Sequence, residues 1–165
     1  MRIPIIALAA AAVAGPALAA APSAADQQFL TQDVQGARYE LALARLAFTR
    51  ATIAPVRAYA TRIVHDHTQA NVALTRLAKK ESVNPPSGMT SQDQATLDRL
   101  KGMNGNSFDK AYVDEVTRIN NEDQQQSDKE KNTTQDQRIK TFLQHFSSMD
   151  DQHKEMGEQL KSKIG

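Results

Sequence analysis

Cysteine and tryptophan are absent from this 165-residue sequence, which contains only seven glycines, six prolines, three tyrosines and five phenylalanines. Without cysteine there are no disulfides, no thiol nucleophile and no lipid attachment at a cleaved N-terminus, so core burial alone must hold the domain together. No stretch alternates β-branched and polar residues as a half-buried strand does. The sequence therefore predicts an all-α protein.

An excess of charge of either sign is also lacking. The chain has 20 basic and 19 acidic side chains, and removal of Arg2 with a signal peptide would leave 19 of each. Because nucleic acids attract clustered positive charge, we expect no nucleic-acid partner. A glycine-rich phosphate loop and a nucleophile elbow are absent too, so no motif indicates an enzyme.

One long apolar run stands at the N-terminus. Met1 and Arg2 precede the apolar residues 3–14, which are followed by Gly-Pro and then by Ala-Leu-Ala at 17–19. This order is typical of a cleaved signal peptide, whereas a membrane span needs about 20 apolar residues. We therefore expect residues 1–19 to be removed after Ala19, export to the periplasm, and no transmembrane segment in the mature chain.

The remaining residues suffice for one domain, and their apolar side chains recur every three or four positions, as on one face of a helix. This spacing predicts long helices over 26–50, 55–81, 107–132 and 135–163, after a flexible N-terminus at 20–25. The four apolar stripes are Leu30, Val34, Ala37, Leu41, Ala44 and Phe48; Val56, Ala60, Ile63, His67, Ala70, Leu74 and Leu77; Phe108, Tyr112, Val116 and Ile119; and Ile139, Phe142, Phe146, Met149, His153, Met156 and Leu160.

Helix breakers between the stripes indicate the topology. Pro55 suits a first helical turn, and Asn-Pro-Pro-Ser-Gly at 84–88 ends the second helix before a short one at 91–101. No stripe can bury its apolar face alone, so we expect an antiparallel four-helix bundle over residues 26–163, with the short helix in the long crossover between the second and third long helices. The polar run 122–137 is interpreted as a solvated face.

Two stripes carry a histidine in a core position, His67 in the second long helix and His153 in the fourth. Counted from the first turn, Glu40 and His67 lie at nearly the same height. Counted from the last turn, Asn120 and His153 differ in height by about 4–5 Å, given the rise of a helix per residue. We therefore expect four polar side chains, one from each long helix, to meet in the interior.

This polar layer has two interpretations. In the first, Glu40, His67 and His153 bind iron, manganese, zinc or copper, and Asp150, on the same face as His153, is the nearest additional carboxylate. In the second, the polar side chains satisfy one another's hydrogen bonds and fix the register of alanine-rich helices. Asp66 points to a neighbouring face and could support the layer from its rim.

Several motifs occur together as they do in a known family. They are Glu40 within residues 37–47, Asp-His-Thr at 66–68, the Phe-Asp-x-x-Tyr segment at 108–112, and His153 in the last helix. In these the chain resembles domain of unknown function 4142, a family of exported bacterial proteins placed with the ferritin-like four-helix folds. The resemblance implies fold and export. Where that family has a histidine in the third long helix, this chain has Asn120.

Two classes of function follow. One is a non-enzymatic binding or structural protein of the cell envelope, of the stress-related kind, whose partner is not indicated. The other is a metal-binding ferritin-like protein with a histidine and carboxylate site in the core of the bundle.

Overall fold

A computed structural model describes residues 21–164, and within this range all regular secondary structure is helical. The helices are α1 (Ala24–Arg50), α2 (Ala54–Lys80), α3 (Ser91–Lys101), α4 (Gly105–Thr133) and α5 (Gln137–Ile164). The all-α prediction is confirmed, and each predicted helix is present with ends that differ by at most two residues. The predicted signal peptide lies outside the described residues. Among the described helices, none combines the length and the hydropathy needed to cross a bilayer.

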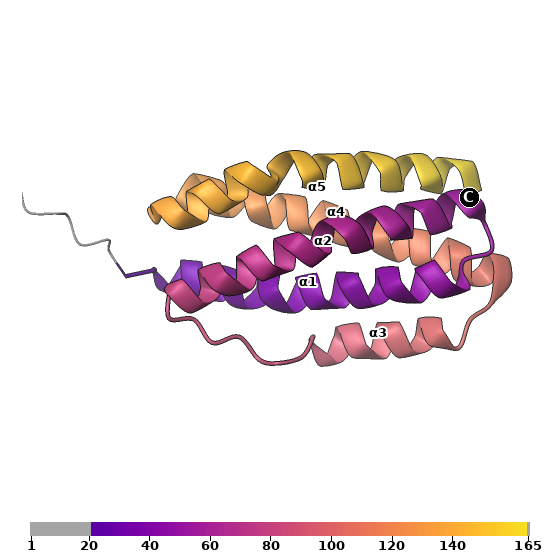
Figure 1. Ribbon diagram of the computed structural model, residues 1–165, viewed down its shortest axis with the longest axis horizontal. Coiled ribbons are helices and arrows are strands. Elements are labelled where there is room, and N and C mark those ends of the chain that lie inside the picture. The colour runs from indigo at the N-terminus through magenta and orange to yellow at the C-terminus, as the bar shows by residue number, and fades with distance from the viewer. Residues whose placement is uncertain (1–20, 165) are drawn as a thin grey trace, which may run out of the picture.

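The four long helices lie side by side, with α3 against the outer side of α1 (Figure 1). The most extensive packing joins α1 to α2 and α4 to α5. Further contacts join α1 to α4 and α2 to α5, so each long helix touches two long neighbours and the four enclose a common interior.

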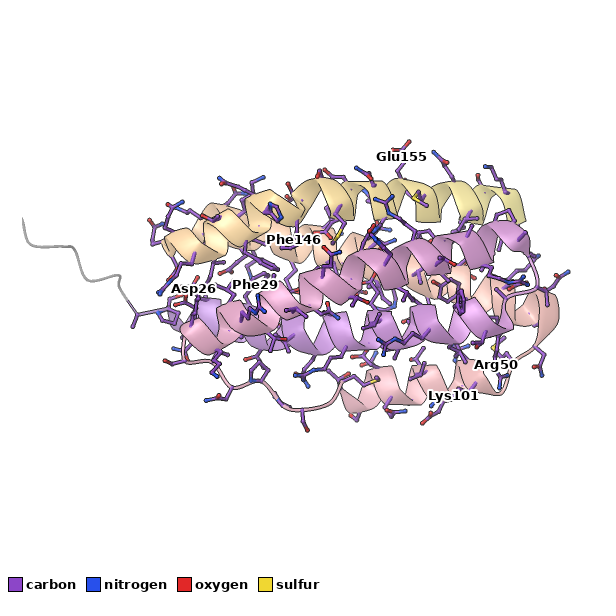
Figure 2. All side chains as sticks on the ribbon, viewed as in Figure 1. Asp26, Phe29, Arg50, Lys101, Phe146 and Glu155 are labelled. Carbon is purple, nitrogen blue, oxygen red and sulfur yellow. The ribbon has the colours of Figure 1, made fainter. Side chains whose placement is uncertain are left out.

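Helix α1 begins two residues earlier than predicted because a capping box starts it. The Ser23 hydroxyl accepts a hydrogen bond from the Asp26 N–H at 3.1 Å, and the Asp26 carboxylate accepts one from the Ser23 N–H at 2.7 Å. Asp26 is buried and also accepts a hydrogen bond from the Thr134 hydroxyl. This contact ties the start of α1 to the turn between α4 and α5, at the end of the molecule where Asp26 is labelled in Figure 2.

A buried carboxylate at the other end holds the turn between α1 and α2. Asp109, on α4, is fully buried and accepts hydrogen bonds from the Thr52 N–H at 3.1 Å and the Ile53 N–H at 3.0 Å, and one from the Thr52 hydroxyl. Pro55 follows in the first turn of α2, as predicted, where its missing N–H leaves no partner unsatisfied. The turn is therefore attached to a third helix.

The core consists of two apolar clusters with polar residues between them. One surrounds Tyr59, Phe108 and Tyr112, near the turn between α1 and α2, and the other surrounds Phe29 and Ile139 at the opposite end. The interval between the clusters, near the middle of the long helices, contains the histidines of α2 and α5. The polar layer is thus flanked by apolar packing on both sides.

Two expectations about burial are wrong. Phe48 is 52% exposed, because the buried face of α1 passes through Tyr39, Leu43 and Ala47 toward α2, α3 and α4. The interpretation of 122–137 as a solvated face also fails in part. The segment is helical to Thr133, but Glu130 is buried and Asp123 lines an internal cavity.

Candidate metal centre

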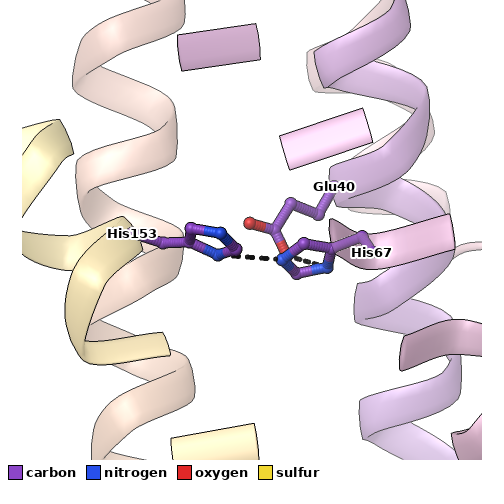
Figure 3. A group of neighbouring side chains, drawn as sticks. All are labelled: Glu40, His67 and His153. Carbon is purple, nitrogen blue, oxygen red and sulfur yellow. Dashed lines mark hydrogen bonds and ion pairs between the residues drawn. The ribbon is translucent and has the colours of Figure 1, made fainter. Parts of the chain in front are cut away.

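His67 and His153 face each other between α2 and α5. Nε2 of His67 lies 3.2 Å from Nδ1 of His153, and the two rings are stacked with centroids 5.1 Å apart and an interplanar angle of 28°. Both side chains are buried (Figure 3). Their positions follow from the apolar stripes of the two helices, because a residue in the stripe points to the interior whatever its chemistry.

Each outer ring nitrogen of this pair meets a carboxyl group. Nδ1 of His67 lies 3.1 Å from Oε2 of Glu40, on α1. Figure 3 marks this contact with a dashed line. Nε2 of His153 lies 3.0 Å from Oδ2 of Asp66, on α2. Glu40, His67, His153 and Asp66 therefore form one continuous row, called here the histidine row.

Asp66 takes the place beside the imidazoles that we expected for Asp150. Residues 66 and 67 differ by about 100° around α2, since a helix has 3.6 residues per turn. While His67 points to the interior, Asp66 therefore points along the edge that faces α5 and reaches His153. Asp150 lies instead in the wall of the neighbouring cavity, and its carboxyl does not belong to the group of ligand atoms described below.

The Asp66 end of the row is ionised. Burial opposes this charge, but hydrogen bonds from His65, His153 and Arg62 hold the pKa of Asp66 below its usual range. Because a carboxylate only accepts hydrogen bonds, Nε2 of His153 carries a proton and donates it to Asp66. Nδ1 of His153 is then the acceptor for the Nε2–H of His67.

The Glu40 end of the row is protonated. Burial raises the pKa of Glu40 to about 8, and the negative charge of Asp33 adds to the shift. Burial also lowers the pKa of His67 and that of His153 to about 4, so both rings are neutral near pH 7. Nδ1 of His67 is then the unprotonated nitrogen of its ring, and it lies 3.1 Å from Oε2 of the Glu40 carboxyl.

An acidic cavity of about 50 Å³ adjoins the row on the Glu40 side. Glu40 and His67 share its wall with the carboxyl groups of Asp33, Asp123 and Asp150, and no lysine or arginine between residues 21 and 164 lines it. Burial raises the pKa of Asp33 to about 7 and that of Asp150 to about 8, with the charges of Glu40 and Asp33 adding to the second shift. Burial and the neighbouring carboxylates raise the pKa of Asp123 as well. A cavity of this size has room for a few waters or an ion.

Asp33 and Asp123 were not among the predicted site residues, although the helical repeat contains a signal for both. Asp33 precedes Glu40 by seven residues, about two turns, and Asp123 follows Asn120 by three. Either offset places a second polar side chain on the same face as the first. The predicted polar layer contained only inward-facing residues at the height of the histidines. A second layer of polar side chains, one or two turns away, was not predicted.

Asn120 contacts the backbone of His153 rather than its ring. Its Nδ2 donates to the Tyr59 hydroxyl at 2.9 Å and to the His153 carbonyl at 3.2 Å. Gly157, one turn after His153, makes this possible, since a Cβ at that position would lie 3.1 Å from Nδ2 of Asn120. The missing side chain leaves room for the Asn120 amide, whose hydrogen bond to the His153 carbonyl joins α4 to α5.

Three ligand atoms converge in the interior: one from Glu40, one from His67 and one from His153 lie within 4.8 Å of one another. These are three of the four residues expected to bind metal. Comparisons with curated proteins and with solved structures found no match. The sequence profile of a family described as Domain of unknown function (DUF4142) matches residues 11–160, and the chain belongs to this family, as its motifs had suggested.

Proposed function

We propose that the protein binds a divalent transition-metal ion between Nε2 of His67 and Nδ1 of His153. The observation that most directly supports this proposal is the 3.2 Å distance between these two nitrogens, which belong to buried imidazole rings that face each other. Two nitrogens bonded at about 2.0–2.1 Å to one tetrahedral ion would be about 3.3 Å apart, so the pair needs little movement to accept one.

Both imidazoles also have the supporting partners that metal-binding histidines use. Such a histidine commonly donates its other ring N–H to a carboxylate, which fixes the tautomer and the ring orientation. Asp66 already holds His153 in this way. If an ion replaced the proton on Nε2 of His67, the proton of the Glu40 carboxyl would pass to Nδ1 of His67, and this N–H would then face Glu40 as a carboxylate.

Oxygen ligands are close by in the acidic cavity. Glu40 belongs both to the converging group and to the cavity wall, and Asp150 and Asp123 extend the set of carboxyl groups. A mixed set of imidazole and carboxylate suits iron, manganese or zinc, and imidazole also suits copper. In this proposal the fold is an antiparallel four-helix bundle of the ferritin-like kind, exported to the periplasm by the predicted signal peptide, and the role is binding rather than catalysis.

A structural role is the second candidate. It is favoured by the continuity of the histidine row, in which each ring nitrogen lies within 3.2 Å of a nitrogen or oxygen of the next residue. Under this alternative the row would fix the register of the helices and no ion would bind. The two candidates differ in their response to metal.

The test is metal stoichiometry in protein purified without a histidine tag. Isothermal titration with zinc, manganese, iron and copper should give one tight site, which His67→Ala and His153→Ala abolish. The exposed His145 provides a matched control, and His145→Ala should retain the site. A melting temperature that neither a chelator nor any of the four metals changes would contradict the proposal and support the structural role.

A further inference from the structure

A second opening lies on the surface between the C-terminal part of α2 and the N-terminal part of α5. It is a groove of about 460 Å³, within the range of small-molecule sites. Leu77 of α2 and Phe142 and Phe146 of α5 supply its apolar surface. Phe146 is labelled in Figure 2, where it lies between these two helices.

The rim of this groove is positively charged. Arg76 and Lys80 on α2, four residues apart, line it with Arg138 and His145 of α5, and no carboxylate between residues 21 and 164 does so. Arg138 is already neutralised, because it donates to Glu81 at 2.7 Å and lies 3.2 Å from Asp136.

Arg76 and Lys80 differ from Arg138, since neither has an ion pair with any described residue. Two like charges four residues apart on one helical face repel each other. Because neither side chain has an anionic partner, this repulsion is uncompensated. The formal net charge of the chain is only +1. The cluster of cationic side chains along this groove is therefore a local feature and does not reflect the charge of the whole chain.

We propose that this groove binds a single-chain anionic amphiphile, such as a long-chain carboxylate, independently of the metal centre. The acyl chain would lie on Leu77, Phe142 and Phe146, and the carboxylate would pair with Arg76 and Lys80. The open surface lined by Leu77, Phe142 and Phe146 fits an acyl chain, and the pair of uncompensated cations, Arg76 and Lys80, fits a single anionic head group.

The test uses dodecanoate below its micellar concentration and the whole protein, with binding measured by isothermal titration. We expect saturable binding with one molecule per chain. Octanoate should bind at least about tenfold more weakly, because each methylene removed from water adds to affinity. Dodecyltrimethylammonium, with the same chain and the opposite charge, should not bind.

Variants locate the site. The double variant Arg76→Glu with Lys80→Glu should weaken dodecanoate binding at least about tenfold, and the loss should shrink at high salt, which screens exposed charges. Arg45→Glu with Lys163→Glu, two exposed cations elsewhere on the surface, provides the matched control. Circular dichroism of each variant checks folding, and Thr141→Trp, which fills the groove without changing charge, should also block binding.

Three outcomes would overturn the proposal. They are equal affinity for dodecanoate in the charge-reversed and control variants, binding of the cationic amphiphile as tight as that of dodecanoate, and binding to vesicles of anionic phospholipid without binding to monomeric dodecanoate.

Discussion

Glu40 and Asp66 occupy opposite ends of one imidazole pair, yet they carry opposite protonation states. Glu40 meets Nδ1 of His67 as a neutral carboxyl, and Asp66 meets Nε2 of His153 as a carboxylate. The difference follows from their surroundings. Burial, with the neighbouring Asp33, raises the pKa of Glu40, whereas hydrogen bonds from His65, His153 and Arg62 lower the pKa of Asp66 although burial opposes this. The row therefore has a direction, and its two hydrogen bonds, from His67 to His153 and from His153 to Asp66, both point toward Asp66.

Asp66→Asn should weaken metal binding while leaving the helices folded. The amide oxygen can still accept a hydrogen bond from His153, but the charge that favours the Nε2–H tautomer is lost. Loss of such a carboxylate commonly costs about 10–100-fold in metal affinity. Titration calorimetry measures the change, with Asp98→Asn, an exposed carboxylate paired with Lys101, as the control. Wild-type affinity in Asp66→Asn would show that the carboxylate does not support the site.

Gly157→Ala and Gly36→Ala should have opposite effects on stability. Nothing lies within 4 Å of a Cβ at Gly36, so alanine there should raise the free energy of unfolding by about 0.5–1 kcal/mol. At Gly157 the methyl group meets Nδ2 of Asn120, which is held by Tyr59 and His153, so we expect a loss of about 1–2 kcal/mol. Urea denaturation compares the two variants, and stabilisation by both would contradict the close packing of α4 and α5.

Asp109→Asn should loosen the turn between α1 and α2. The carboxylate accepts two backbone N–H groups and one hydroxyl, and an amide offers only one acceptor oxygen. We expect a loss of about 1–3 kcal/mol in the free energy of unfolding. Asp114→Asn, which removes an exposed partner of Lys161, should change it by less than about 0.5 kcal/mol. Equal effects of the two substitutions would mean that the buried contact is unimportant.

The acidic cavity should make the metal-free protein less stable as pH rises from 6.5 to 8. The raised pKa values of Asp33, Glu40 and Asp150, at about 7 to 8, mean that the folded state holds protons that the unfolded state has already released. The linkage relation then gives a free energy of unfolding that falls with pH in this window. Below pH 6.5 the lowered pKa values of His67 and His153 make the free energy of unfolding rise with pH. The effect of the carboxyl groups should therefore be measured above pH 6.5.

Asp150→Asn isolates this effect, because an amide has no proton to release. The fall in stability between pH 6.5 and 8 should be smaller in Asp150→Asn than in the wild type, and unchanged in Asp128→Asn, an exposed carboxylate of α4. Chemical denaturation at four pH values in the presence of chelator provides the measurement. Stability that rises over this window in the wild type would show that the cavity carboxyls ionise without cost.

The apolar repeat was enough to predict the four long helices and the facing of His67 and His153, and the helix breakers between the stripes placed the short helix at 91–101. A three-and-four spacing fixes which side chains share a face, and a histidine inside such a stripe is carried to the interior with its neighbours. The apolar repeat does not show which face of a helix is buried when the helix packs against three neighbours, as α1 does, and not two. Phe48 was misplaced for this reason, since α3 covers part of α1 and shifts its buried face toward Leu43 and Ala47.

The partners of the histidines were harder to predict than the histidines themselves. Asp66 reaches His153 because α2 and α5 are neighbours, which depends on the packing order of the helices and not on spacing within one of them. Asp123 belongs to a run of polar residues, a pattern that is typical of a solvent-exposed face. It lines the cavity because α4 packs so that Asp123 lies near Asp33 and Asp150. The family resemblance supplied the fold class but none of these contacts.

Gly157 has a consequence for anyone who wishes to rebuild this centre in another scaffold. A designer would copy the residues with chemistry, Glu40, Asp66, His67 and His153, and would fill a helix position such as 157 with alanine as a better helix former. The methyl group would lie 3.1 Å from Nδ2 of Asn120, so this amide, which donates to the His153 carbonyl, would have to shift by a few tenths of an ångström. The transplant therefore requires an empty volume to be copied as faithfully as the ligands.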